Sequence, residues 1–358
     1  MNILFIGRLD YPPKQGGDAI QIENYKKIIS QKGHHVEIAS LINEPGNYDF
    51  VDLFNISRVY DLIYQLNSKV KNIPILILHP IHQKKEYLHR MKSLGVKIPG
   101  SERLKFITRN ILSNKFRFNQ LLLIFRNEKK LIHSLLNKIA FFHFLSPKER
   151  EWFENDFGYK IDNEKLLIFE NAVSYAFDNS KPLKDREIDI LISGRIEPQK
   201  NSINTAKCLT SFKDKRIVFA GQMNRYYKAY CNEFLKIVQQ NGNFKYIGSK
   251  SFSGMQELYG NSKIVFSLSL SEAAPRTLVE LEALANKAIF IGTNRKPIEG
   301  SNINTGYYID PENLSEAAEL LKEIFNKIES GFNFTFPHIN TWEEEIEPLL
   351  NLYKQFEK

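Results

Sequence analysis

A glycine followed by two cations, Gly194, Arg195 and Lys200, is the pattern in this sequence best suited to bind a diphosphate. Glycine allows a tight backbone turn, the arginine fork can bind two phosphate oxygens, and lysine adds a compact positive charge. The three residues directly follow a short apolar run, so we expect them at the end of a buried strand. The alternative is a pair of solvated surface charges.

Two carboxylates separated by seven residues, Glu272 and Glu280, follow another apolar run. We expect a helix over Arg276–Ala285, with Pro275 in its first turn. Amides at the start of a helix carry partial positive charge and bind phosphate. Glu272 would then lie in the loop and Glu280 within the helix, although each acid taken alone also fits an ordinary surface position.

The paired glycines Gly16 and Gly17 follow the first apolar run. Their backbone amides could approach an anionic group closely, and the helix expected after them would offer its positive end. An ordinary turn between a strand and a helix is the alternative. The spacing differs from G-x-G-x-x-G, which disfavours a dinucleotide-dependent dehydrogenase.

Short apolar runs alternating with amphipathic stretches predict the elements that position these residues. Runs of this kind indicate buried parallel strands in two doubly wound sheets, whose ligands bind at the carboxyl ends of the strands. The predicted strands are Asn2–Gly7, Val36–Leu41, Phe50–Phe54, Ile73–Leu78, Phe141–Leu145, Leu166–Phe169, Ile188–Ser193, Arg216–Ala220, Phe244–Ile247, Ile264–Leu268, Ala288–Ile291 and Tyr307–Ile309.

The chain of 358 residues is long enough for two α/β domains. The segment Asn171–Arg186 has polar residues and proline without periodicity, which indicates a linker. We therefore expect an α/β protein with Rossmann-like domains over 1–175 and 184–338. A helix at about 340–358, with Thr341 as its N-cap, is expected to pack back on the first domain.

Taken together, these stretches resemble glycosyltransferase family 4 over nearly the whole chain, except for residues 84–138. The resemblance implies the GT-B fold, in which two Rossmann-like domains face an interdomain cleft. The matching motifs are Pro12-Pro13 with Gly16-Gly17, Asn171-Ala172-Val173, Gly194-Arg195 with Lys200-Asn201, and Glu272 with Glu280.

The resemblance implies a retaining glycosyltransferase that moves a sugar from a UDP- or GDP-sugar to a glycan or lipid-linked acceptor in bacterial surface polysaccharide or lipopolysaccharide synthesis. Arg195 and Lys200 would hold the leaving diphosphate, Glu280 would bind the ribose, and Glu272 would face the transferred sugar. Glu282 stays open as an alternative ribose ligand because Glu282-Ala283 resembles the family's Glu-Ala dipeptide. The other implied donor-binding positions are Gly16, Gly17, Gly194, Ile247, Ala274, Arg276, Thr277 and Leu278.

The resemblance also implies a catalytic histidine after the fourth strand, for which His79 is favoured over His82, with a structural role as the alternative. No two aspartates lie two residues apart, so the Asp-x-Asp motif that holds a metal in many sugar-nucleotide transferases is missing. We therefore expect a metal-independent reaction without a cofactor, in which protein cations stabilise the leaving diphosphate.

Positive charge is concentrated in residues 84–138, where 14 Lys or Arg face three acids while the whole chain carries +8. Apolar stripes flanked by these cations would suit a helix on an anionic membrane surface, or equally helices packed on the first sheet with a solvated basic face. Nucleic acid is disfavoured because the segment contains no recognised binding module.

The location and the competing functions follow from weaker signals. Cys208 and Cys231 show neither metal nor redox spacing, and no basic leader precedes the first strand, so we expect a cytoplasmic protein. If the basic segment binds lipid, the protein would be peripheral on the inner face of the plasma membrane. The alternatives are a GT-B sugar-nucleotide epimerase and a non-catalytic sugar-nucleotide-binding partner subunit.

Overall fold

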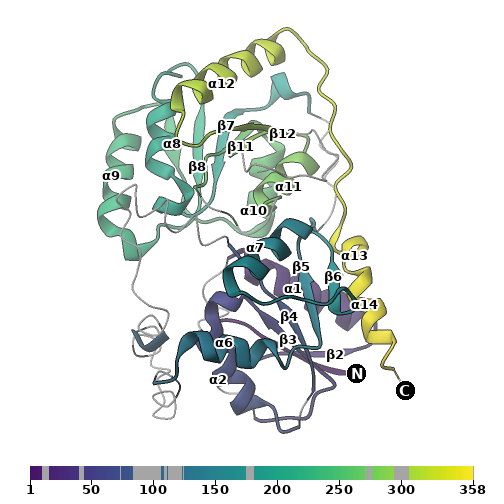
Figure 1. Cartoon of the computed structure of the whole chain (residues 1–358). Helices are drawn as coiled ribbons and strands as arrows, with labels where there is room; N and C mark the ends of the chain where they lie inside the picture. Colours follow the sequence, from purple (N-terminus) through teal and green to yellow (C-terminus); the bar gives the residue numbers. More distant parts are fainter. Residues whose placement is uncertain are drawn as a thin grey trace. The chain divides into compact units, whose positions relative to one another are not determined.

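The computed structural model describes residues 1–9, 16–39, 44–72, 74–83, 106–108, 111, 123, 125–174, 181–270, 272, 276–293 and 306–357. The chain forms two compact units (Figure 1). The first unit contains Met1–Lys85, Lys97–Asn171 and Trp342–Lys358, and the second contains Ala172–Thr341. Within the described residues, the chain leaves the first unit after Asn171 and returns to it at Trp342.

The first unit is built on a parallel six-stranded sheet with the order β2-β1-β3-β4-β5-β6. Parallel strands buried on both faces explain why the apolar runs are almost unbroken by polar residues. The strands are β1 (Asn2–Ile6), β2 (His35–Ile38), β3 (Phe50–Phe54), β4 (Ile75–His79), β5 (Phe141–Phe144) and β6 (Leu166–Ile168).

Helices cover both faces of this first sheet (Figure 1). One face packs against α2 (Val59–Lys69), α6 (Glu128–Leu136) and α7 (Pro147–Phe157). Aromatic contacts join the other face to α1 (Gly17–Gln31), α13 (Trp342–Glu345) and α14 (Glu347–Lys354); for example, the rings of Phe50 and Tyr353 lie 4.8 Å apart. The C-terminal helices are thus part of the first unit.

The second unit repeats the architecture with the strand order β12-β11-β10-β7-β8-β9, again all parallel. Its core lies on both faces of the sheet, between the strands and the covering helices. The strands are β7 (Ile188–Ser193), β8 (Ile217–Ala220), β9 (Phe244–Tyr246), β10 (Ser262–Ser267), β11 (Ile289–Thr293) and β12 (Gly306–Ile309).

The helices of the second unit also fall on two faces (Figure 1). One face packs against α8 (Ser202–Leu209), α9 (Lys228–Gln239) and α12 (Leu314–Glu329). The other packs against α10 (Phe252–Gly260) and α11 (Leu278–Ala285). The two crossing segments pair with each other, since the Val173 amide donates to the Asn340 carbonyl at 3.2 Å.

The predicted α/β fold with two Rossmann-like sheets is confirmed, and each predicted strand begins within two residues of an observed one. The C-terminal segment differs in detail from the single helix expected there. It breaks at Ile346 into two short helices, and Pro348 lies in the first turn of the second one, where its missing N–H costs no hydrogen bond.

Candidate functional site

The predicted diphosphate-binding residues lie where the strand order of the second sheet reverses. β7 is followed by β8 and β9 on one side, whereas β10, β11 and β12 continue on the other. Ligands of open α/β sheets bind beyond the carboxyl ends of the strands at such a point. The turn after β7 carries Gly194, Arg195 and Lys200, and the turn after β10 carries Glu272, so the fold brings these two motifs together.

Lys200 bridges the two turns. Its ammonium pairs with a carboxylate oxygen of Glu272, and the exposed fractions of the two side chains are only 21% and 13%. Lys200 ends a short 3-10 helix, Pro198–Lys200, and Asn201 follows it in the left-handed region at φ 53°. The Leu270 amide also donates to the Gln199 carbonyl at 2.8 Å, which fixes the β10 turn against the β7 turn.

Glycines at the ends of β7 and β8 allow their turns to pack backbone against backbone. Gly194 has φ +148°, and the stem of Lys200 runs across it at 3.7 Å from where a Cβ would lie. Gly221 has φ +147°, and a Cβ there would collide with the Gly194 carbonyl. The Gly221 amide donates to the Gly248 carbonyl beyond β9 at 2.9 Å, so the turn containing Ile247 is fixed to the same edge.

Arg195 is half exposed at this edge and is held by a buried acid that the sequence analysis missed. Its guanidinium lies 2.8 Å from Glu197 Oε1, and Glu197 Oε2 accepts a hydrogen bond from Asn224 at 2.6 Å. Glu197 is 3% exposed, so its charge is compensated mainly by these two side chains. The sequence offered one signal for this role, because Glu197 is an acid two residues after Arg195. It does not show that Asn224 lies beside Glu197.

Helix α11 is the next described element after β10 and Glu272, and the phosphate site at its start stays a prediction. Thr277 is its N-cap, and the Thr277 hydroxyl oxygen accepts a hydrogen bond from the Glu280 amide at 3.2 Å. Thr277 and Arg276 are buried, whereas Leu278 is partly exposed in the first turn. The helix therefore starts two residues later than expected; Ala274 and Pro275 lie outside the described residues.

The two candidate ribose ligands have different surroundings. Glu280 is 1% exposed, and its Oε1 accepts a hydrogen bond from the Tyr308 hydroxyl at 2.6 Å. Glu282 lies beside Tyr259, and burial raises its pKa to about 7 although the Tyr259 hydrogen bond lowers it. Since the Tyr259 hydroxyl oxygen also lies 2.9 Å from the Ser193 hydroxyl oxygen, Glu282 lies near the end of β7, whereas Glu280 lies near β12.

His79, the predicted catalytic histidine, ends β4 but lies inside the first unit. It is 1% exposed, with Nε2 2.9 Å from Asp52 Oδ2 and Nδ1 2.8 Å from His143 Nδ1. The Tyr353 hydroxyl donates to the same Asp52 oxygen at 2.8 Å. Burial raises the pKa of Asp52 to about 8 and lowers that of His79 to about 3. The catalytic role of His79 stays a prediction, but this buried network favours the structural alternative because both ring nitrogens are occupied.

The loop after β4 is held by a second buried carboxylate, Glu149. Its two oxygens accept hydrogen bonds from the His82 and Leu145 amides, each at 2.7 Å, and burial raises its pKa to about 8. His82 Nε2 also lies 2.8 Å from Asp156 Oδ2. Ile81 adopts φ +47°, which is unusual for a β-branched residue, so the loop is held in a strained conformation.

The Gly16-Gly17 turn lies at the start of α1, beyond the carboxyl end of β1. Gly16 is the extended N-cap residue, and Asp18 in the first helical turn forms an ion pair with Arg8 at 3.0 Å. The end of β1 is held by α2, because Gln65 Nε2 donates to the Gly7 carbonyl at 2.7 Å. Pro12 and Pro13 lie outside the described residues.

Most of the basic segment 84–138 lies outside the described residues. In its described part, α6 buries Leu131, Ile132, Leu135 and Leu136 in the first core, as expected for a helix packed on the sheet. Phe125 just before α6 is 81% exposed. Among the described helices, none has an apolar stretch long enough to span a bilayer.

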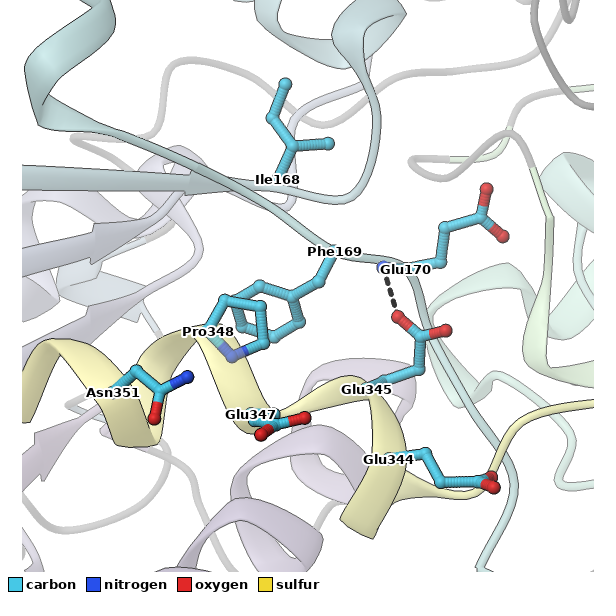
Figure 2. A pocket seen from close by; sticks show the side chains of 8 residues that line it. All are labelled: Ile168, Phe169, Glu170, Glu344, Glu345, Glu347, Pro348 and Asn351. Atoms are coloured by element: carbon cyan, nitrogen blue, oxygen red, sulfur yellow. Dashed lines mark hydrogen bonds between the residues drawn. The ribbon is translucent and has the colours of Figure 1, made fainter.

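A shallow groove of about 510 Å³ in the first unit lies between the end of β6 and α14 (Figure 2). Ile168, Phe169 and Pro348 form its apolar part, and Glu345 accepts a hydrogen bond from the Glu170 amide at 3.2 Å. Glu344 and Glu347 add further negative charge. Such a lining would repel a diphosphate, so this groove does not compete with the β7–β10 edge as the donor site.

Comparisons with known proteins agree with this geometry. Residues 175–334 match the family model described as glycosyl transferases group 1. Among solved structures, sucrose-phosphate synthase from Thermosynechococcus elongatus aligns with a TM-score of 0.67 at 12% identity, covering 99% of this chain and 98% of that one. No curated protein sequence gives a significant match.

Two further structures have the same fold. A glycosyltransferase from Rickettsia africae aligns with a TM-score of 0.61 at 17% identity, covering 99% of this chain and 97% of that one. HepE from Anabaena in complex with UDP-glucose aligns with a TM-score of 0.61 at 13% identity, covering 98% and 95%. The chain therefore has the GT-B fold of these proteins, and its residues 175–334 match the family model of the group 1 glycosyl transferases.

Proposed function

We propose that this protein is a retaining glycosyltransferase that uses a nucleoside-diphosphate sugar without a metal ion. The observation that carries the proposal is the Lys200–Glu272 pair at the β7–β10 edge, in the segment that precedes α11 in the chain. A site that binds a sugar-nucleotide needs positive charge near the diphosphate and a polar group near the sugar. Lys200 and Arg195 supply the charge, and Glu272 supplies the polar group facing the sugar.

The chemistry follows from the charges that develop during transfer. Breaking the bond between the anomeric carbon and the phosphate oxygen leaves negative charge on the diphosphate and oxocarbenium character on the sugar. Lys200, Arg195 and the first amides of α11 would stabilise the diphosphate, as preorganised donors do in other active sites. The leaving phosphate oxygen would accept the proton of the acceptor hydroxyl, which then attacks from the same face and retains the anomeric configuration.

We propose a UDP- or GDP-sugar as donor and a glycan or lipid-linked glycan as acceptor, in surface polysaccharide or lipopolysaccharide synthesis. HepE, which shares the fold, has been solved with UDP-glucose, and this supports a uridine donor. The first unit would bind the acceptor. Its loop after β4, which Glu149 fixes by two hydrogen bonds, is a suitable place for that contact.

Thermal-shift measurements with UDP-, GDP-, ADP- and CMP-sugars test the donor, because a ligand that binds only the folded protein raises its melting temperature. We expect a shift with UDP- or GDP-sugars. NMR of the product formed with that donor should show the anomeric configuration of the donor sugar. An inverted product would contradict the retaining mechanism, and formation of an epimer without acceptor would identify the epimerase alternative.

Peripheral membrane contact is a second proposal, based on the exposed Phe125 and the exposed cations Arg126, Lys129 and Lys130 beside it. An aromatic ring next to cations can bind an anionic lipid surface. We expect sedimentation with vesicles containing anionic lipid, reduced in Phe125→Ala. Phe332→Ala, which removes an exposed ring from the second unit, should bind normally. Equal sedimentation of both variants, or equal binding to neutral vesicles, would contradict this proposal.

A further inference from the structure

Tyr308 contacts one of the two candidate ribose ligands from a strand that no motif includes. Its hydroxyl donates to Glu280 Oε1 at 2.6 Å, although the two residues are 28 positions apart in sequence. The Arg276 Nε atom lies 3.9 Å from the same oxygen. Among the described residues, the Tyr308 hydroxyl on β12 and the Arg276 guanidinium just before α11 therefore both attract this carboxylate oxygen.

Gly306 leaves room for the Tyr308 ring, and Gly292 leaves room for the neighbouring Phe290 ring. In the β11–β12 ladder, Phe290 pairs with Gly306 and Gly292 pairs with Tyr308, so aromatic and glycine alternate on one face of the sheet. A Cβ on Gly306 would lie 3.0 Å from the Tyr308 hydroxyl oxygen, and a Cβ on Gly292 would collide with the Phe290 ring. Glycine weakens a strand, so its presence twice in this ladder indicates that space for the rings is needed.

We propose that Tyr308 is a positioning residue that orients the Glu280 carboxylate toward the nucleotide ribose. This inference rests on the proposed function, in which Glu280 binds the ribose hydroxyls. A carboxylate accepts several hydrogen bonds, so the bond from Tyr308 fixes its plane and leaves acceptor capacity for the ribose. Without the hydroxyl, the Arg276 guanidinium attracts Oε1, and the carboxylate turns away from the ribose.

Calorimetric binding of UDP and 2′-deoxy-UDP, with GDP and 2′-deoxy-GDP in parallel, tests the inference without requiring the sugar or the acceptor. The wild type should bind the ribonucleotide about tenfold more tightly than its 2′-deoxy form, as expected for a hydrogen bond to a charged group. Glu280→Gln should reduce this discrimination. Tyr308→Phe should reduce it to about threefold or less while leaving affinity for the 2′-deoxy form nearly unchanged.

Two further variants separate positioning from general damage to the fold. Gly306→Ala retains the hydroxyl but displaces it, so it should reproduce the loss of discrimination seen in Tyr308→Phe. Tyr307→Phe removes a hydroxyl on the opposite face, where the ring packs in the other core beneath Lys327, and should behave like the wild type. Melting temperatures of all variants show that each one is folded.

The outcomes distinguish the inference from the proposed function. If Glu280→Gln loses discrimination but Tyr308→Phe keeps it, Tyr308 does not orient the carboxylate and the inference is overturned. If the wild type binds nucleotides without any preference for the ribose hydroxyl, Glu280 is not a ribose ligand, and the inference falls with that assignment. If no nucleotide binds the folded wild type, the proposed function itself is wrong.

Discussion

Replacing Lys200 by alanine is the sharpest test of the diphosphate site. The Lys200–Glu272 pair is partly exposed, so its loss should cost less than about 1 kcal/mol of folding free energy. Loss of a preorganised charge that stabilises the leaving group costs far more, about 2.7–4 kcal/mol of transition-state free energy, or 10²–10³ in kcat. The variant should therefore be folded and almost inactive.

The assay measures release of nucleoside diphosphate from the donor identified by thermal shift. Lys207→Ala is the matched control, because Lys207 lies on α8 of the same unit and forms an exposed ion pair with Glu233 at 3.3 Å. We expect normal kcat for Lys207→Ala and a loss of at least about 10²-fold for Lys200→Ala. Their melting temperatures should be similar.

A double variant separates two roles that Lys200 could have. If the lysine only neutralises Glu272, then Lys200→Ala/Glu272→Gln should recover the activity lost in Lys200→Ala. If the lysine binds the diphosphate, the double variant should remain at least as impaired as Lys200→Ala, because the cation that faces the leaving group is still missing. Full recovery would show that Lys200 does not bind the diphosphate.

Metal dependence, the Arg195 guanidinium and the buried side chains of Asp52 and Tyr353 offer further tests. Transfer should persist in excess chelator, and strict dependence on added Mg²⁺ or Mn²⁺ would contradict the metal-independent mechanism. Arg195→Ala should lower transfer by about 10²-fold, whereas unchanged turnover would remove Arg195 from the site. Burial raises the pKa of Asp52 to about 8 in the folded protein, so its contribution to stability is complete below pH 4 and is lost as pH rises to about 8. Asp52→Asn should therefore flatten the fall in melting temperature between pH 5 and 8. An unchanged slope would argue against a protonated Asp52. Tyr353→Phe should lower unfolding free energy by about 1–3 kcal/mol in denaturant titrations, and a change near zero would show that this hydrogen bond is not stabilising.

The fold was predictable because a buried parallel strand has a local signature. Phe50–Phe54 and Ile188–Ser193 were predicted with the bounds that the structure has, since each is a short, mostly apolar run, interrupted by one aspartate. The boundary of α11 was less predictable. Arg276 fits a helix by pattern, but the Thr277 side chain caps the helix and shifts its start to Leu278.

The site was predictable only where its residues belong to one motif. Gly194, Arg195 and Lys200 lie within one turn, so their spacing carried the information. The partners of these residues come from other strands and turns, as Asn224 does for Glu197 and Tyr308 for Glu280. A single sequence does not show which strands pair or in what register, and this pairing is what brings such residues into contact.

His79 illustrates the same limit. The sequence correctly placed it at the end of the fourth strand, where ligands often bind. Its surroundings come from β3, β5 and α14, which supply Asp52, His143 and Tyr353. Nothing in the local pattern around His79 indicates that a helix more than 250 residues later closes over this strand.

A crystal structure of the protein grown with UDP or GDP would show directly whether the β7–β10 edge binds a diphosphate. We expect the two phosphates within hydrogen-bonding distance of Lys200 Nζ and of the first backbone amides of α11, with the Arg195 guanidinium beside them. A nucleotide bound in another part of the second unit, or phosphates that contact none of these groups, would contradict it.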